Sequence, residues 1–123
     1  MILPILLTLS AAGCTVTDGD TIRCGKERIR LVGIDAPEMR GCPRNRVCAP
    51  GSGPQSKTSL QRLMAGKVRI DRVGRDRYGR TLAHVYAGRV NLACEQLRQG
   101  RAIYKPRWDN GRRLAKECPH ARP

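Results

Sequence analysis

The sequence has no phenylalanine, and its only aromatic residues are three tyrosines and one tryptophan among 123 residues. A core without large aromatic side chains must be filled by Val, Ile, Leu and Ala, so we expect a small one. This length corresponds to about one domain, because single cores of roughly 100 to 150 residues are the commonest size. The sequence therefore predicts one domain and no second module.

Acidic residues are also scarce, since ten Asp and Glu stand against 24 Lys and Arg and give a net charge of +14. Of the 24 basic residues, 19 are Arg, whose planar guanidinium group matches phosphate oxygens two at a time. This excess indicates a polyanionic partner. Charge alone does not separate a nucleic-acid-binding protein from a membrane-surface protein or from a basic surface that only maintains solubility.

The sequence lacks an apolar run of the length that crosses a bilayer, which is about 20 residues. Met1 to Gly13 (MILPILLTLSAAG) is uncharged but shorter, so we expect no integral membrane span. We interpret this segment as the apolar part of an export signal, with a first β-strand as the alternative. Residues 14–123 are then one domain of a bacterial protein that is secreted or resides in the periplasm or cell envelope.

Zinc-binding patterns are missing as well. The sequence has no Cys-x-x-Cys pair, and its two histidines, His84 and His120, do not lie at ligand spacing from a cysteine pair. Six cysteines in a short chain instead indicate disulfides and an oxidising compartment. We predict the pairs Cys14–Cys24, Cys42–Cys48 and Cys94–Cys118.

The first predicted pair follows from the pattern of the hairpin. Placing Val16 opposite Ile22 puts both apolar residues on one face and Cys14 opposite Cys24, with a three-residue loop or a bulge at residues 18–20. The second pair closes a short loop rich in turn residues, and the third uses the cysteines that remain. A competing use of Cys14 is acylation, because residues 11–14 loosely resemble a bacterial lipoprotein attachment site. We favour the disulfide, since acylation would leave Cys24 as an unpaired thiol.

The remaining pattern predicts five short strands with helices between and after them. The strands are expected at the two arms of 15–24, at 28–34, at 68–73 and at 80–86, and the helices at 54–65, at 91–98 and in a short segment that Asp109 or Asn110 caps and that runs through Cys118. This arrangement is typical of the OB fold, which often binds nucleic acid. The predicted fold class is α+β, mainly β: a five-stranded OB-fold barrel with about three short helices.

Half of the ten acidic residues lie within residues 18–38, against the charge trend of the chain. Asp18 is explained as turn chemistry beside Gly19. The others of interest, Asp20, Asp35 and Glu38, would converge at strand ends and repel one another unless a cation lies between them. The segment is not an EF-hand loop, because the ligand spacing and terminal Glu are absent. These carboxylates therefore indicate a site for a hard cation.

Three segments resemble the signature blocks of the staphylococcal nuclease (thermonuclease) family. They are residues 16–21 (VTDGDT), 30–38 (RLVGIDAPE) and 76–83 (DRYGRTLA), in the family's order and at compatible spacing. The resemblance extends from about Val16 to Tyr104. It implies a five-stranded OB barrel with three helices and the Ca²⁺-dependent hydrolysis of DNA and RNA. It also implies Ca²⁺ ligands, which are the carboxylates of Asp20 and Asp35 and the backbone carbonyl of Ala36.

The resemblance further implies that Glu38 positions or deprotonates the attacking water, while Arg30 and Arg80 neutralise the phosphorane and the leaving oxygen. The chemistry needs such groups, because attack on a phosphodiester places two negative charges on a centre that carried one. Arg30 and Asp35 would point to opposite faces of a regular strand, so we expect the chain to bend at Gly33. Candidates for contacting the nucleotide are Arg77, Tyr78 and Tyr104.

Two other function classes remain, and each predicts a different sequence feature. A non-catalytic OB-fold module that binds nucleic acid would be indicated by loss of Glu38 or of either arginine, and all three are present. A membrane-active protein would need a strongly cationic amphipathic helix, and the predicted helix at 54–65 carries too little charge. The sequence therefore predicts a monomeric Ca²⁺-dependent phosphodiesterase that acts on DNA and/or RNA.

Overall fold

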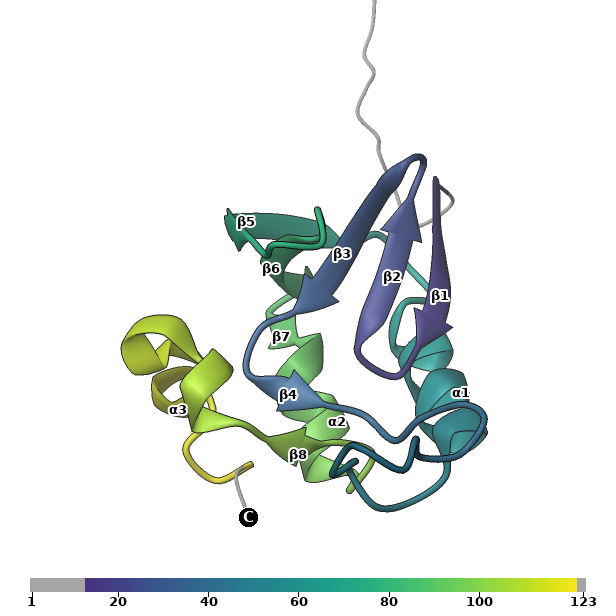
Figure 1. The fold of residues 1–123 in the computed structure, drawn as a ribbon. Coiled ribbons are helices and arrows are strands. Elements are labelled where there is room, and N and C mark those ends of the chain that lie inside the picture. The colour runs from purple at the N-terminus through teal and green to yellow at the C-terminus, as the bar shows by residue number, and fades with distance from the viewer. Residues whose placement is uncertain (1–12, 122–123) are drawn as a thin grey trace, which may run out of the picture.

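The structure is a computed structural model that describes residues 13–121. The predicted export segment, apart from Gly13, lies outside the described residues. The strands are β1 (Cys14–Asp18), β2 (Thr21–Cys24), β3 (Glu27–Leu31), β4 (Ile34–Asp35), β5 (Arg69–Arg75), β6 (Thr81–Ala87), β7 (Val90–Asn91) and β8 (Ile103–Tyr104). The helices are α1 (Gly53–Leu63), α2 (Leu92–Arg98) and α3 (Arg113–Glu117), and the 3-10 turns η2 (Pro106–Trp108) and η3 (Asn110–Arg112) precede α3 (Figure 1). No helix in this part of the chain is long and apolar enough to cross a bilayer.

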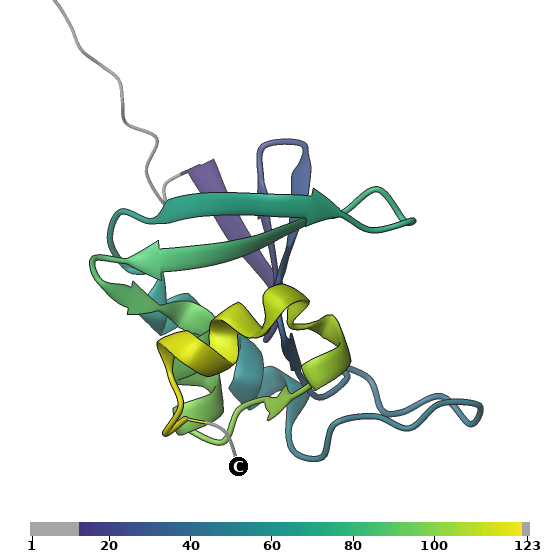
Figure 2. The same cartoon turned by 90° about the vertical axis from the view of Figure 1, so that its left-hand side faces the viewer.

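The main sheet has the strand order β1-β2-β3-β6-β5. The pairs β1–β2, β2–β3 and β5–β6 are antiparallel, whereas β3 and β6 are parallel. A meander of three strands thus joins a later hairpin through one parallel pair, and the hairpin crosses the meander at a steep angle (Figure 2). This mainly β arrangement with three helices confirms the predicted fold class, and the five long strands correspond to the five predicted ones.

Three short strands were not predicted from the sequence. β4 and β8 pair with each other outside the main sheet, and β7 adds to β6. The predicted third strand at 28–34 instead ends at Leu31 and resumes as β4, because Gly33 between them has a φ of +84° that ends regular pairing. Pairings of two residues leave little pattern in a sequence, so only the folded chain identifies them.

The helices begin where capping side chains occur. The Ser52 hydroxyl accepts a hydrogen bond from the Gln55 backbone N–H at 3.2 Å, and the Asn91 side chain accepts one from the Ala93 N–H at 3.0 Å. α1 lies against β1 and α2, and α2 also contacts β6. The largest fully buried apolar side chains are aliphatic, as the lack of phenylalanine requires: Ile22, Ile29, Leu31, Ile34, Leu60, Val85, Leu92 and Leu114.

The three disulfides are the predicted pairs: Cys14–Cys24, Cys42–Cys48 and Cys94–Cys118. In the first hairpin Val16 pairs with Ile22 and Cys14 with Cys24, as the side-chain pattern predicted. The register shifts between Val16 and Asp18, so the bulge begins just before the predicted stretch and the turn contains only two residues. The Cys94–Cys118 bridge ties α2 to the chain that follows α3.

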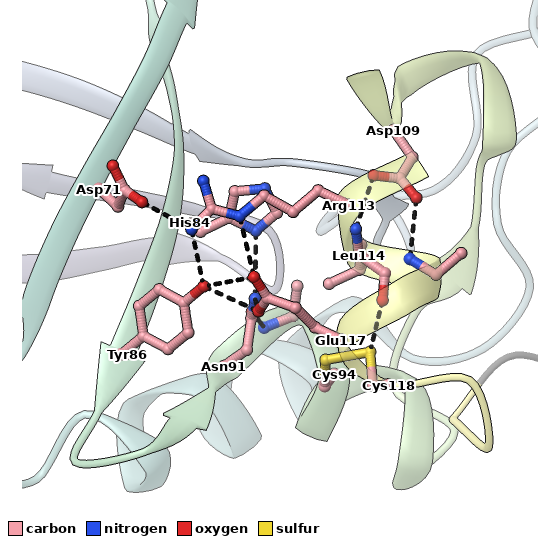
Figure 3. Close-up of polar contacts among 12 residues, drawn as sticks. Asp71, His84, Tyr86, Asn91, Cys94, Asp109, Arg113, Leu114, Glu117 and Cys118 are labelled. Atoms are coloured by element: carbon pink, nitrogen blue, oxygen red, sulfur yellow. Dashed lines mark hydrogen bonds and ion pairs between the residues drawn. A yellow bond between two sulfur atoms is a disulfide. The ribbon is translucent and has the colours of Figure 1, made fainter. Parts of the chain in front are cut away.

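A polar network holds α3 against β6 (Figure 3). The carboxylate of Glu117 accepts hydrogen bonds from the Tyr86 hydroxyl at 2.7 Å and the Asn91 amide at 2.9 Å, and it forms an ion pair with Arg113 at 2.9 Å. Arg113 also reaches Asp71 on β5 at 2.6 Å. Burial by itself would raise the pKa of Glu117, but Arg113, Asn91 and Tyr86 hold it at about 2.

Glu117 should therefore contribute to stability in a pH-dependent way. Its folded-state pKa of about 2 lies below the ordinary value of 4.5, so its contribution is full above pH 4.5 and is lost as the pH falls toward 2. We expect Glu117→Gln to lower the free energy of unfolding, measured by urea denaturation, at pH 7, and the gap from the wild type to shrink at pH 2.5. A gap of equal size at both pH values would contradict this role.

Candidate active site

Asp20 lies in the β1–β2 turn and is only 4% exposed. Its carboxylate accepts hydrogen bonds from the Thr21 hydroxyl and the Ala36 backbone N–H, both at 2.8 Å, and forms an ion pair with Arg30 at 3.0 Å. Burial would raise the pKa of Asp20, but Asp18, Arg30 and the Ala36 N–H hold it below its ordinary value. The turn thus presents a buried, ionised carboxylate.

Asp18 has the predicted turn role, because its carboxylate accepts a hydrogen bond from the Asp20 backbone N–H at 3.1 Å. Burial, followed by the neighbouring Asp20 carboxylate, raises the pKa of Asp18 to about 7. The two acidic side chains beside Gly19 therefore differ in protonation near neutral pH.

The turn is held by contacts with the helices α1 and α2. A Cβ on Gly19 would clash with the Ser56 hydroxyl of α1, so only glycine fits this close approach. The Gly19 carbonyl accepts a hydrogen bond from the fully buried Gln96 of α2 at 2.8 Å, and Gln96 in turn accepts one from Ser59 at 2.6 Å. Sequence reasoning missed Gln96. Its signal was a lone amide among the apolar residues of a short helix.

Asp35 ends β4 and is 3% exposed. Its carboxylate lies 3.7 Å from the Arg30 guanidinium and 3.8 Å from that of Arg46. Burial raises the pKa of Asp35, and the negative charge of Asp20 raises it further, against the opposing effects of Arg30 and Arg46. The charge of Asp20 thus disfavours the ionised form of the buried Asp35, which is a condition that a bound cation relieves.

Arg30 joins the two carboxylates. Besides its ion pairs with Asp20 and Asp35, it donates a hydrogen bond to the Ile34 carbonyl at 3.1 Å. Its guanidinium carbon lies 4.8 Å from the centre of the Trp108 ring. Trp108 is 43% exposed and was not singled out from the sequence, although it is the single tryptophan of the chain. The bend at Gly33, which the sequence predicted, brings Arg30 and Asp35 together.

Gly33 should be intolerant of substitution. Its φ is +84°, and a Cβ would lie 2.8 Å from the Leu114 side chain. We expect Gly33→Ala to lower the free energy of unfolding by about 2–4 kcal/mol, from backbone strain and overpacking together. Urea denaturation measures this loss.

Gly88 supplies the matched control for that prediction. Its φ is +62°, yet nothing lies within 4 Å of an added Cβ. Gly88→Ala should therefore lower the free energy of unfolding through backbone strain alone, by about 1–2 kcal/mol. Equal losses in the two variants would show that the contact with Leu114 does not matter.

Glu38 follows Pro37 at the start of the loop that leads to α1. The backbone there packs so closely against Gly53 that a Cβ at that position would clash with the Glu38 carbonyl. The Glu38 side chain is 31% exposed and forms an ion pair with Arg46 at 3.1 Å. Sequence reasoning missed Arg46, because a position eight residues beyond Glu38 in an irregular loop carries no periodic signal.

Arg80 occupies a separate cluster at the β5–β6 turn. Its Nε lies 2.7 Å from the Asp76 carboxylate, which also accepts hydrogen bonds from the backbone N–H groups of Tyr78 and Arg80. Within residues 13–121, the ion pair of Arg80 is with Asp76 and not with the carboxylates near Arg30. Arg80 directly precedes Thr81, which pairs with Ile29, so the parallel strands keep it beside the strand that carries Arg30.

The predicted nucleotide contacts are placed in different environments. Tyr78 is 60% exposed, with the Arg77 guanidinium 5.1 Å from its ring centre, and its carbonyl accepts a hydrogen bond from Arg28. Tyr104, on β8, is half-buried and donates a hydrogen bond to Asp109 at 2.6 Å. The Asp109 carboxylate also caps α3, as the sequence had suggested. Tyr78 therefore presents an open face, whereas the Tyr104 hydroxyl serves the fold.

The donor set suits a hard cation. Carboxylate and carbonyl oxygens are the ligands that such ions prefer, and Asp20, Asp35 and the Ala36 backbone supply these types side by side. No group of three or more His, Cys, Asp or Glu side chains in the described range 13–121 is placed to hold a metal. A cation here would thus depend on two carboxylates, with main-chain carbonyl and water oxygens completing its shell.

Comparisons with known proteins identify a family and several relatives of this chain. The family model described as staphylococcal nuclease homologue matches residues 28–121, which include Arg30, Asp35, Glu38 and Arg80. A Haemophilus influenzae protein named an uncharacterized endonuclease is 40% identical over 93 residues, covering 71% of this chain and 47% of that protein. The thermonucleases of Staphylococcus intermedius and Staphylococcus hyicus are 38% and 33% identical, covering 84% and 80% of this chain. The chain spans 65% and 63% of these two relatives' lengths.

Proposed function

The chain belongs to the staphylococcal nuclease family, and on that premise we propose that it is a Ca²⁺-dependent phosphodiesterase that hydrolyses DNA and/or RNA as a monomer. One observation carries the proposal. Two buried carboxylates, Asp20 and Asp35, both pair with the Arg30 guanidinium, and the charge of Asp20 raises the pKa of Asp35. A third carboxylate, Glu38, lies close by, because Arg46 pairs with both Glu38 and Asp35. A site of this kind is suited to a divalent cation and a phosphate together.

The carboxylates of Asp20 and Asp35 and the carbonyl of Ala36 are the proposed Ca²⁺ ligands. Bound Ca²⁺ supplies positive charge that draws in the phosphodiester and stabilises the charge that develops during attack. The protein prepares for this by keeping Asp20 ionised despite its burial, through Arg30, Thr21 and the Ala36 N–H. The Asp20 carboxylate is therefore charged before substrate arrives.

Arg30 and Arg80 are the proposed stabilisers of the phosphorane. Arg30 is held on several sides, by Asp20, by the Ile34 carbonyl and by the Trp108 ring, so little reorganisation is required when charge develops. Arg80 lies in the β5–β6 turn, directly before the strand that pairs with β3, and would bind the leaving oxygen. The two guanidiniums would then contact different oxygens of one phosphate.

Glu38 is the proposed base that takes a proton from the attacking water. Its side chain is 31% exposed, so water has access, and its backbone packs closely against Gly53. The exposed Tyr78 ring and Arg77 beside it are proposed to contact the nucleotide. Tyr104 lies on β8, which pairs with β4, and is also proposed to contact the nucleotide.

Three disulfides support a location in an oxidising compartment. We therefore propose that the protein is secreted or resides in the periplasm or cell envelope. The Cys14–Cys24 bridge favours the disulfide use of Cys14 over acylation.

The decisive experiment measures release of acid-soluble nucleotides from DNA and from RNA by the purified, oxidised protein. We expect release with Ca²⁺ and loss of activity in EDTA, because the site offers only oxygen ligands of the type that hard cations choose. Full activity in EDTA would contradict the metal assignment. Binding of nucleic acid without release in Ca²⁺ would indicate a non-catalytic OB-fold module instead.

A further inference from the structure

We propose that Arg46 is a third phosphate-binding arginine of this site, delivered by the Cys42–Cys48 loop and held by Glu38 and Asp35 until a cation displaces it. The proposal rests on the proposed nuclease function. It adds a residue that neither the sequence motifs nor the roles assigned above include.

Arg46 lies in the Cys42–Cys48 loop and contacts two carboxylates of the proposed site. One of its terminal nitrogens lies 3.1 Å from the Glu38 carboxylate and 3.8 Å from that of Asp35. It therefore touches both the proposed base and a proposed cation ligand. A positive charge at this position lies where the negative charge of a bound phosphate would also be stabilised.

The loop is built to deliver this side chain. It runs between β4 and α1 and projects from the body of the fold (Figure 2). The Cys42–Cys48 disulfide closes a ring with a sequence separation of 6, and Arg46 lies inside that ring, with its N–H donating to the Pro43 carbonyl at 3.3 Å. A short covalent ring has few conformations, so it limits where Arg46 can go at little further entropic cost.

Arg46 and Arg30 differ in how firmly they are held. The Arg30 side chain is 13% exposed and has a main-chain carbonyl and an aromatic ring as further partners. The Arg46 side chain is 44% exposed, and its ion pairs are with the two carboxylates. Arg30 is thus a fixed part of the site, whereas Arg46 can leave its partners without losing a buried hydrogen bond.

The charge balance gives the reason for Arg46 to move. Asp20, Asp35 and Glu38 bring three negative charges, which Arg30 and Arg46 offset in part. A divalent cation on Asp20 and Asp35 adds two positive charges, so it repels Arg46 and removes the need for it there. The freed guanidinium then faces the incoming phosphate. Arg46 should consequently oppose cation binding before substrate arrives and favour substrate binding afterwards.

Replacing Arg46 by alanine should therefore strengthen Ca²⁺ binding and weaken substrate binding. Calorimetry with Ca²⁺ alone should show binding to Arg46→Ala about three- to tenfold tighter than to the wild type, because a competing positive charge is gone. At saturating Ca²⁺, the KM for a 12-nucleotide single-stranded DNA should rise about tenfold, since a charge-assisted contact with phosphate is lost. Arg44→Ala is the matched control, because Arg44 is an exposed arginine of the same ring, and it should change neither value by as much as twofold.

Each outcome decides the proposal. Weaker Ca²⁺ binding by Arg46→Ala, or an unchanged KM, would overturn it, as would equal effects in Arg44→Ala. Opening the ring with Cys42→Ser and Cys48→Ser should raise KM at least threefold, and an unchanged KM would exclude delivery by the loop. If the wild type cleaves nothing, the nuclease proposal fails by itself. The calorimetry, together with the affinity for the same DNA carrying a fluorescent label, then still tests Arg46.

Discussion

Replacing Glu38 by glutamine should lower kcat by about 10² or more, the usual scale for a lost general base. The amide keeps the shape of the side chain but cannot accept the proton of the attacking water. The fold should survive, because the side chain is partly exposed and its ion pair is with the exposed Arg46 side chain. The measurement is kcat on DNA at saturating Ca²⁺, with thermal melting as the check on folding.

Glu95→Gln is the matched control for this variant. Glu95 lies on α2 and pairs with Arg98 at 2.9 Å, so the change removes a carboxylate and an ion pair away from the proposed site. Its kcat should stay within twofold of the wild type. If Glu38→Gln also retained near wild-type turnover, water activation would have to be assigned to another group.

Replacing Arg80 by lysine should also lower turnover by about 10² or more, although the charge is kept. Lysine has no fork with which to bind the leaving oxygen and a neighbouring phosphate oxygen at once, and a lost donor of this kind typically has an effect of that size. The variant also breaks the contact from Arg80 to Asp76, so its free energy of unfolding must be measured alongside kcat.

Arg89→Lys controls for the general effect of exchanging a surface arginine. Arg89 is exposed in the turn between β6 and β7, and its replacement should leave kcat unchanged. Arg80 pairs with Asp76 rather than with the carboxylates near Arg30, so the turnover of Arg80→Lys tests whether Arg80 acts on the substrate at all. Wild-type turnover in Arg80→Lys would leave Arg30 and Arg46 as the arginines available to the phosphate.

Much of this fold follows from local pattern. Apolar alternation in the first hairpin predicted the pairing of Val16 with Ile22, and with it the Cys14–Cys24 bridge, because a slip of one residue would turn every side chain to the other face. The need to join Arg30 and Asp35 located the bend at Gly33, a residue with a positive φ that few side chains tolerate. The hairpin register and the bend both depend on residues that lie close together in the sequence, so they can be predicted from it.

The contacts that complete the site were decided by the tertiary structure. Arg46 reaches Glu38 from an irregular loop, Trp108 lies beside Arg30 from the far end of the chain, and Gln96 holds the Gly19 carbonyl from α2. None of these pairs is related by a helical or strand period, because their positions are set by how packed elements and a disulfide ring meet in space. The sequence by itself determined the fold class and the disulfide pairing, and it located the acidic residues that are candidates for the site. Only the folded chain determined which arginines and which aromatic ring surround them, because long-range packing leaves no periodic signal in the chain.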